Sequence, residues 1–522
     1  MRRKGRDRVL LVGVICGVML GTILGSIRPA VVAPSPVSTP HPSPLTPHGL
    51  IPLVAALHVH SSVSTGGLSL EQVVEQAEKL GLDAVLLSDN FLLQYEYGIW
   101  PLRGVFRRTV SLPSVLDHGV GRYLAEIAAV QAQHQRVLLI PGIEVAPHYY
   151  WTGSLLDRNL TMHNAQKNFL VFGLAQPEDY AALPVAGNTF SYRYGWTSAL
   201  SLTPGLLFVP AAWLWRRHTY RTRLVGVVPY KLADRYRTPA LLLAGLALLL
   251  LLNASPFGQP VFSLYESGLG YRPYQAFIDT VVARGGSVVW SMPEARDFHV
   301  QAYGPLGQVT IRTDPYPEAL LFTTGYTAFG GVYEETRTAT RPGGIWDQVI
   351  GLYLNGHRAK PPYATGELAF HGPGHDTKAL DRVLTVLWVR ERTAAGLAEA
   401  MQAGRMYGVE QYRKEFGLRL ESFRVECQGG TRGAGSGDTL DPQGARDLTV
   451  HVSVSATDRG AHPIKVTIIR SGQVVARLVG ETPFDHRFVD ERVLSNERIA
   501  YRVEIRGDGE ILSNPIFVKP SA

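Results

Sequence analysis

The sequence predicts an α/β fold that is interrupted by a membrane hairpin, preceded by a transmembrane helix and followed by a β-sandwich. Residues 51–90 pass from an apolar strand through an amphipathic helix to a second apolar strand. Uncharged apolar stretches occupy residues 9–27 and 196–215, as is typical of segments that enter a bilayer. Beyond Phe416 the pattern changes to short alternating strands separated by turn residues, which indicates the β-sandwich.

Length and charge limit the functional classes. At 522 residues the chain is too long for one ordinary domain. Its net charge of +7 comes from two basic clusters, residues 1–8 with +4 and residues 216–237 with +6, which leaves −3 on the remainder. Basic residues beside apolar segments are topology signals, and the remainder offers no basic face for nucleic acid. The two cysteines, Cys16 and Cys427, imply no disulfide framework.

Residues 1–28 are expected to be a basic cytoplasmic end and a transmembrane anchor. The 19 residues from Val9 to Ile27 carry no charge. As a helix they measure about 28 Å, close to the roughly 30 Å of a bilayer core. Five preceding cations predict a cytoplasmic N-terminus and export of the chain that follows, with a cleaved signal peptide as the alternative. A glycine recurs every four residues on one face, which suits a homodimer or packing against later segments: Gly13, Gly17, Gly21 and Gly25.

Residues 29–50 form a Pro-rich linker, with seven prolines between Pro29 and Pro47. A segment of this composition is semi-extended and acts as a spacer. It is expected to hold the next domain away from the membrane.

The stretch 51–90 carries the first candidate ligands. Its first apolar run ends in His58 and His60, which strand alternation places on one face, where two nitrogens can share a metal. On spacing alone, a surface or core-edge pair is the alternative. A helix over residues 69–80 follows, with Ser69 and Gln72 as its capping pair. The second strand, 84–87, ends in Ser88-Asp89-Asn90, so polar residues follow both strands.

This stretch resembles the first motif of the PHP family (polymerase and histidinol phosphatase domains). That motif reads roughly H-x-H-S-x-x-S-D-G, then a helix, then G-L-D-x-(apolar)-T-D-H. Thr65 stands where the family has Asp, and Asn90 stands where it has His. Both missing groups are usual metal ligands in the family.

Later stretches resemble further PHP motifs in the family's order. Residues 141–144 match P-G-(apolar)-E, whose Glu, here Glu144, commonly bridges two metals. Residues 168–173 resemble H-(apolar)-L-x-x-G with Asn168 for His. Residues 285–293 resemble G-G-x-(apolar)-A-H-P with Met292 for His, and residues 366–372 resemble G-x-S-D-x-H-G with Ala369 for Asp and His371 kept. The helix over 393–405, followed by Met406-Tyr407, resembles the A-x-x-x-G-R-x-Y ending of exported, carbaryl-hydrolase-like members.

The resemblance covers residues 51–173 and 285–408 and implies a distorted (β/α)7 barrel of PHP type. The expected barrel segments are 51–195 and 258–414, with the β-sandwich over 415–522. The family's barrel holds up to three metals at the C-terminal ends of its strands, a suitable arrangement for hydrolysis.

Four of nine ligand positions match the family: His58, His60, Glu144 and His371. Thr65, Asn90, Asn168, Met292 and Ala369 do not match. Because His58, His60 and Glu144 belong to one metal's shell, the resemblance implies one divalent metal per chain at most, zinc or manganese, or none. Asp89 is a candidate for orienting a ligand from the second shell. Candidate substitute ligands are His163, Asp297 and His299.

Residues 196–257 are expected to form a membrane hairpin around a basic cytoplasmic loop. The first segment ends in Trp213 and Trp215, which suit a membrane interface. The second, from Pro239 to Leu252 and extendable to Phe257, is short for a span, so a tilted hairpin, a thinned bilayer or a re-entrant pair all fit. Buried core helices are the alternative. If the two segments enter the membrane, the chain before the hairpin and the chain after it both lie on the extracytoplasmic side.

Two functional hypotheses follow. The first is a membrane-anchored hydrolase with one metal, acting on a phosphoester, an ester or a carbamate. The second is a catalytically inactive PHP-like protein that serves as a binding or structural module at the membrane surface. Because the hairpin leaves the barrel where sites lie, a small-molecule or lipid-linked ligand is a further expectation.

Overall fold

The structure is a computed structural model that describes residues 49–302, 307–373, 378–427, 432–442, 447–491 and 498–519. The expected anchor, its glycine register and most of the Pro-rich linker lie outside these residues. The chain divides into two compact units. The first contains the described residues up to Leu92, residues 112–183 and the chain from Leu264 onwards; the second contains residues 93–111 and 184–263.

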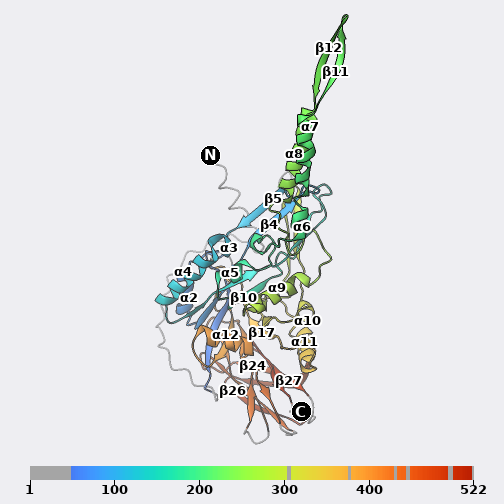
Figure 1. The fold of residues 1–522 in the computed structure, drawn as a ribbon. Helices are drawn as coiled ribbons and strands as arrows, with labels where there is room; N and C mark the ends of the chain where they lie inside the picture. Colours follow the sequence, from blue (N-terminus) through green and yellow to red (C-terminus); the bar gives the residue numbers. More distant parts are fainter. Residues whose placement is uncertain are drawn as a thin grey trace. The chain divides into compact units, whose positions relative to one another are not determined.

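The first unit begins with the predicted strand–helix–strand segment (Figure 1). Strand β1 (Ile51–Val59) pairs in parallel with β2 (Ala84–Leu87), and α2 (Leu70–Lys79) connects them. Ser69 and Gln72 form the predicted reciprocal capping box of α2. The helix buries its apolar stripe, as its 3.6-residue pattern predicts: Leu70, Val73, Val74 and Ala77.

Two sheets carry the strands that position the site. The first runs in the order β19–β18–β1–β2–β6 within a larger sheet, and the second runs β17–β16–β13–β10–β7–β3. The chain passes from the first sheet to the second at Ser88, between β2 and β3, and at Pro141, between β6 and β7. Their bounds are β3 (Asp89–Asn90), β6 (Leu138–Ile140), β7 (Gly142–Val145), β10 (Phe169–Phe172), β13 (Ser287–Trp290), β16 (Ala328–Val332), β17 (Tyr363–Gly366), β18 (Val383–Val389) and β19 (Met406–Gln411).

The fold is therefore mixed α/β, and its hydrogen bonding forms two sheets without showing the expected distorted (β/α)7 barrel. Strands β1, β2 and β6 are parallel, but β10 is antiparallel to both of its neighbours, β7 and β13. An isolated parallel bridge pairs Val59 of β1 with Phe370, which lies just beyond β17, and the Leu368 amide donates to the carbonyl of Leu57. Strand pairing of this kind depends on partners far apart in the sequence, so local periodicity does not specify it.

Helices and a small sheet complete this part of the unit. The helices are α3 (Val115–His118), α4 (Val120–Gln133), α5 (Pro177–Ala181), α9 (Arg272–Ala283), α10 (Ala319–Phe322), α11 (Ile345–Leu354) and α12 (Ala394–Ala403). The small sheet has the order β14 (Asp297–Ala302), β15 (Gln308–Thr313), β9 (Thr161–His163) and β8 (Tyr150–Thr152).

The C-terminal residues form short strands, as their alternating pattern predicts. One sheet contains β21 (Gly433–Gly435), β20 (Leu418–Cys427), β23 (Leu448–Ala456) and β26 (Phe484–Asp490). The other strands are β22 (Thr439–Leu440), β24 (Pro463–Arg470), β25 (Gln473–Glu481), β27 (Ile499–Arg506), β28 (Gly509–Ser513) and β29 (Ile516–Val518). Because β28 pairs with β19, with Tyr407 opposite Ser513, these strands continue the larger sheet of the same unit.

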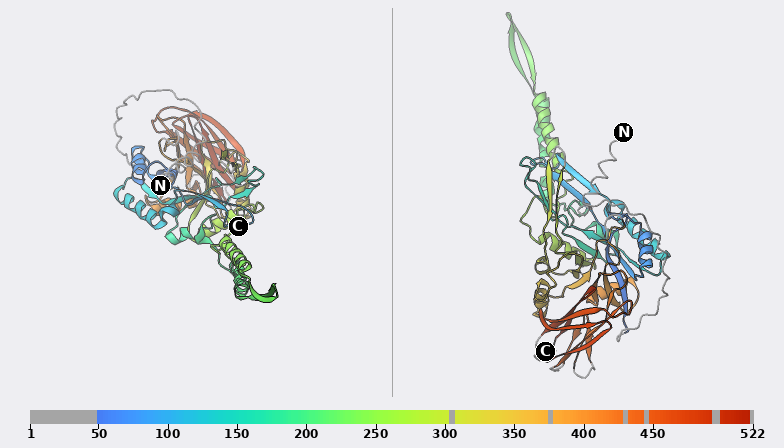
Figure 2. Two further views of the ribbon diagram at one scale, coloured as in Figure 1. Left: turned by 90° about the horizontal axis from the view of Figure 1, so that it is seen from above. Right: turned by 180° about the vertical axis from the view of Figure 1, so that it is seen from behind.

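The second unit contains two apolar helical segments side by side, drawn in green in Figures 1 and 2. The first segment consists of α6 (Trp196–Leu200), the short helix η2 (Thr203–Leu207) and α7 (Phe208–Arg216), and the second is α8 (Arg237–Ala254). By length and composition alone, Trp196–Arg216 and Arg237–Ala254 are candidate membrane spans, with most of their side chains exposed. The helices pack through small residues, since Ala211, Ala240 and Ala247 are buried.

The basic loop between the helices is an ordered β-hairpin. Strands β11 (His218–Val225) and β12 (Val228–Arg235) pair along their full lengths, and Gly226, with φ +66°, supplies the tight turn. A second hairpin of this unit, β4 (Leu93–Gly98) and β5 (Arg107–Leu112), has a connecting loop in which the Gly104 amide donates to Oδ1 of Asn253 at 2.8 Å. That bond fixes the loop to the last turn of α8.

Candidate metal centre

The end of β1 bends at His58 and brings two histidines together. The pairing of β1 with β2 shifts register between Leu57 and Val59, and His58 has φ +74°. A left-handed backbone at a non-glycine residue costs about 1–3 kcal/mol and persists where the surroundings impose it, often at functional sites. His58 and His60 are both buried, and their ring centroids lie 5.1 Å apart.

Glu144 supplies the oxygen that these histidines face. It lies on β7, where its backbone pairs with Asn90 of β3. Its Oε1 is 3.1 Å from Nε2 of His58, and its Oε2 is 3.6 Å from Nε2 of His60. Candidate ligand atoms of His58, His60 and Glu144 all lie within 4.8 Å of one another, so the structure brings together the three residues expected to share one metal.

Two asparagines orient the Glu144 carboxylate. The amide Nδ2 of Asn90 donates to Oε2 at 2.5 Å, and Nδ2 of Asn168 donates to Oε1 at 2.6 Å. These are two of the positions where the PHP motifs have histidine. Each carboxylate oxygen has a second acceptor site, so the two amides orient Glu144 without using all of its capacity.

His371 lies beside this group but not within it. Its ring stacks on that of His60 with centroids 4.3 Å apart. Its Nδ1 lies 3.1 Å from Oγ1 of Thr65, which donates to Oδ1 of Asn90 at 2.9 Å. His371, expected as a fourth ligand, therefore contacts the centre through His60 and Thr65.

Asp89 holds the loop after His60 rather than a histidine ring. Its carboxylate accepts from the Ser61 amide at 2.8 Å, the Ser61 hydroxyl at 2.8 Å and the Ser64 hydroxyl at 2.6 Å. Burial raises the pKa of Asp89, against the opposing effect of these donors. The expected orientation of a histidine by Asp89 is thus replaced by support of the loop that carries Thr65.

Glu367 is a site residue that the sequence motifs did not single out. Its side chain is fully buried, and Oε2 lies 3.6 Å from Nδ1 of His58. The Ser291 hydroxyl donates to Oε2 at 3.3 Å, and the backbone amide of Met292 donates to Oε1. The available signal was an acidic residue inside an otherwise apolar and glycine run, residues 366–370, because an unpaired carboxylate is rarely buried.

The electrostatics of the two histidines differ. Burial lowers the pKa of His58, but Glu144 and Glu367 outweigh burial and raise that pKa to about 9. Burial, together with the neighbouring rings of His371 and His58, holds the pKa of His60 well below its usual value. Burial acts to raise the pKa of Glu144, yet the adjacent His58 leaves it lowered. His60 is accordingly neutral and can offer a lone pair.

The remaining sequence candidates lie apart from this group. Met292, with φ +37°, contributes its backbone amide to Glu367. His163 and His299 belong to the small four-stranded sheet, where His163 bonds to Thr152 at 2.8 Å and His299 to Asp297 at 3.1 Å. Among the described residues, His163, Asp297 and His299 join no group with metal-ligand spacing.

The residues fit one divalent metal. Both ring nitrogens of His60 and Nε2 of His58 are buried without a hydrogen-bond partner, and buried polar atoms of this kind normally have one. Two imidazole nitrogens and a carboxylate oxygen are the donor set of a three-ligand catalytic zinc centre. Nε2 of each ring faces the one carboxylate that the two amides hold in place.

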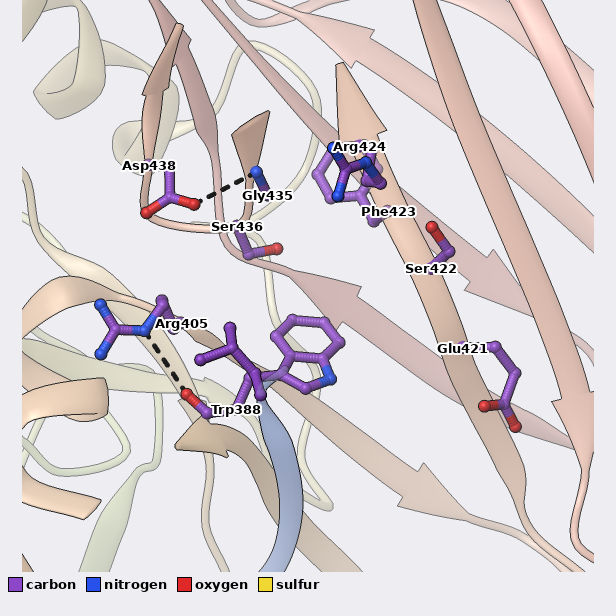
Figure 3. Close-up of a pocket in the computed structure, with 10 residues that line it drawn as sticks. Trp388, Arg405, Glu421, Ser422, Phe423, Arg424, Gly435, Ser436 and Asp438 are labelled. Atoms are coloured by element: carbon purple, nitrogen blue, oxygen red, sulfur yellow. Dashed lines mark hydrogen bonds between the residues drawn. The ribbon is translucent and has the colours of Figure 1, made fainter. Parts of the chain in front are cut away.

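A separate cleft is lined by Trp388 of β18, by Arg405 just before β19, and by residues of β20 and β21 (Figure 3). Trp388 and Phe423 supply its aromatic lining, and Arg405 donates to the carbonyl of Trp388 at 3.4 Å. None of the candidate ligands lines this cleft. It therefore adds no chemistry to the metal centre.

No protein-family model and no curated protein matches the chain. One similar solved structure is a two-domain protein from Bacteroides vulgatus, described as containing a predicted PHP-like metal-dependent phosphoesterase. It has 11% identity and a TM-score of 0.34, with 91% of this chain and 95% of that chain covered. Another is an amidohydrolase from Chromobacterium violaceum with bound sulfate and no metal, with 16% identity, a TM-score of 0.25, and 62% and 89% covered. Both TM-scores are low, so the function of this chain is inferred from its site residues.

Proposed function

We propose that this chain is a membrane-anchored hydrolase of PHP type that uses one divalent metal held by His58, His60 and Glu144. The observation that carries the proposal is the set of buried, unpartnered ring nitrogens beside the Glu144 carboxylate. In this proposal the two site-bearing sheets are the two halves of a distorted PHP barrel, which the passages of the chain at Ser88 and Pro141 support.

Three residues of the chain would bind the metal, and two others orient one of these ligands. A divalent ion in such a centre supplies Lewis acidity and activates water for attack on a phosphoester, ester or carbamate. His60 would provide a neutral nitrogen donor, His58 would provide a second once the metal displaces the proton from its Nε2, and Glu144 would provide the anionic oxygen. Asn90 and Asn168 fix the Glu144 carboxylate, so its position is set before anything binds.

Metal analysis of the purified full chain tests this proposal. We expect zinc or manganese at about one equivalent per chain in the wild type, and loss of the metal in His58→Ala and Glu144→Ala. His299→Ala, which removes a histidine outside the group, is the matched control and should keep the metal. A panel of phosphoesters, esters and carbamates then assigns the substrate class. A wild-type chain that takes up neither zinc nor manganese after incubation would overturn the proposal.

The second candidate is a metal-free binding or structural module. It is favoured by the amides of Asn90 and Asn168, which replace two expected ligands and satisfy Glu144 internally. In that case the wild type, the two site variants and the control would all contain no stoichiometric metal and hydrolyse no member of the panel.

Membrane insertion of the second unit is part of the proposal. The spans of 21 and 18 residues measure about 31 and 27 Å as helices, close to the roughly 30 Å of a bilayer core. Exposed aromatic residues mark both ends of the first segment, Trp196 at its start and Trp213 and Trp215 at its end. The basic β11–β12 hairpin would lie in the cytoplasm and the first unit on the extracytoplasmic side, within reach of a lipid-linked ligand.

Cysteine labelling in intact cells tests this topology. In a Cys16→Ser, Cys427→Ser background, Leu156→Cys in the first unit and Val227→Cys at the hairpin tip provide probes that are each 94% exposed. We expect a membrane-impermeant maleimide to label residue 156 in intact cells and residue 227 only after permeabilisation. Equal labelling of both positions before permeabilisation would contradict a spanning hairpin.

A further inference from the structure

We propose that Glu367 is a positioning residue that fixes the proton of the His58 ring on Nδ1 and so leaves Nε2 free to bind the metal. This inference rests on the proposed function and deepens it, because it adds a residue outside the ligand set. The PHP motif has no defined residue at this position, so the role belongs to this chain.

One carboxylate oxygen of Glu367 lies behind the His58 ring. Its Oε2 is 3.6 Å from Nδ1 of His58. The Ser291 hydroxyl lies between them, 3.3 Å from Nδ1 and 3.3 Å from Oε2. Nε2 of His58 points the other way, to Oε1 of Glu144 at 3.1 Å. The ring is therefore held between a carboxylate on its Nδ1 side and the metal-binding carboxylate on its Nε2 side.

These contacts define the direction of the hydrogen bonds. The carboxylate of Glu367 can only accept, so the Ser291 hydroxyl uses its hydrogen for Oε2. The oxygen of Ser291 then accepts from Nδ1–H of His58, and the same Nδ1–H lies towards Glu367 directly. A proton on Nδ1 leaves the Nε2 lone pair for a metal, and a carboxylate behind a ligating imidazole also raises its basicity.

The backbone around Glu367 leaves space for its carboxylate and donates a hydrogen bond to it. A Cβ at Gly330 would collide with Oε1 of Glu367, so only glycine leaves this space. Met292 has a left-handed backbone, with φ +37°, and its amide donates to Oε1. Strand β16 and the turn that follows β13 thus both accommodate one side chain, which is expected of a residue whose exact placement matters.

The charges of the centre support the same assignment. Glu144 and Glu367 are both buried, on opposite sides of one imidazole. Buried carboxylates require compensation, and one divalent cation at the centre would compensate both of them. Glu367 would then contribute charge to the centre while remaining outside its ligand shell.

Two variants test the role without relying on activity. Glu367→Gln keeps the shape, but its amide donates towards Nδ1 and Ser291, which favours the His58 tautomer with the proton on Nε2. Gly330→Ala displaces the carboxylate and leaves it charged. Glu410→Gln is the control, because Glu410 is also a buried carboxylate but pairs with Arg337 at 3.6 Å and Arg382 at 3.3 Å.

The first readout is the affinity of the full chain for Co²⁺ and Zn²⁺, measured by the visible cobalt spectrum and by chelator competition. We expect Glu367→Gln and Gly330→Ala to bind about 10- to 100-fold more weakly than the wild type, and Glu410→Gln to bind normally. A normal cobalt affinity in Glu367→Gln would overturn the inference. A thermal midpoint close to the wild type in Glu367→Gln separates positioning from a general loss of stability.

The second readout is the metal-free crystal structure of Glu367→Ala. Without the carboxylate, the His58 ring is expected to rotate away from Glu144. A ring that stays in place with its contact to Glu144 intact would overturn the positioning role. If the wild type binds no metal, the proposed function fails, and this structure still decides whether Glu367 positions His58.

Discussion

The side-chain amide of Asn168 donates a hydrogen bond of 2.6 Å to Oε1 of Glu144. The PHP motifs place a histidine ligand where this chain has Asn168, and the same holds for Asn90, whose amide donates to Oε2 at 2.5 Å. An amide nitrogen with two hydrogens cannot bind a metal through a lone pair, but it is a suitable donor to a carboxylate. At two positions where the motifs have histidine, this chain therefore has amides that support Glu144.

The bond from Asn168 should be measurable in the stability of the metal-free protein. Asn168→Ala removes the amide donor of a buried carboxylate oxygen, and hydrogen bonds to charged groups contribute about 1.5–3 kcal/mol. We expect the free energy of unfolding, measured by denaturant titration with chelator present, to fall by that amount. Asn159→Ala, at an exposed loop position, is the control. A loss in Asn168→Ala no greater than the control's would show that Glu144 does not depend on this amide.

The same relationship predicts how a second metal could be restored. In Asn90→His with Asn168→His, two imidazoles replace the two amides on either side of Glu144, and each offers a nitrogen ligand. We expect the metal content to rise from about one towards about two equivalents per chain, because Glu144 could then bridge. Asn159→His controls for an added surface histidine. A double variant with unchanged metal content would mean that the remaining ligands do not suffice for a second site.

Local patterns predicted the elements that carry the centre better than the contacts between them. The helix α2 with its Ser69–Gln72 box, the strands β1 and β2, and the meeting of His58, His60 and Glu144 all agree with the sequence. Each depends on short-range periodicity or on a motif. The antiparallel pairing of β10 and the division into two sheets depend on distant partners and were not predicted.

Glu367 and the β11–β12 hairpin were missed for different reasons. Glu367 acquires its role only when residues 291 and 367, far apart in the chain, lie together at His58. The hairpin was interpreted as a loop because of its charges, although β-branched and aromatic residues alternate within it and Gly226 stands at its turn. Charge density thus obscured a strand pattern that was present.

His148 should make the stability of the first unit depend on pH. Burial lowers the pKa of His148 from 6.5 to about 4. The folded state therefore disfavours the protonated ring. The contribution of the neutral His148 ring to the free energy of unfolding is fully present above pH 6.5 and is lost as the pH falls towards 4. A shift of this size corresponds to about 3 kcal/mol. His148→Gln should flatten the pH dependence of unfolding in this range relative to the wild type. Parallel curves for the two proteins would contradict the shifted pKa.

Arg502 should be essential for the packing of β27 on the rest of the first unit. Its buried guanidinium binds Asp347 of α11 at 2.9 and 2.7 Å and Glu504 at 3.0 Å. Arg502→Met leaves the buried carboxylate of Asp347 without its cation and leaves Glu504 to the exposed Arg506, and breaking a buried pair in this way costs about 3–5 kcal/mol. We expect a loss of that size in the free energy of unfolding.

Arg506→Met is the matched control for Arg502→Met, because Arg506 lies on the same strand but is 63% exposed and pairs with Glu504 at 3.8 Å. An exposed pair contributes about 0–1 kcal/mol, so this variant should unfold nearly as the wild type does. Adding Asp347→Leu to Arg502→Met should recover part of the loss, since it removes the stranded charge. Equal effects of Arg502→Met and Arg506→Met would show that burial does not strengthen the Arg502 network.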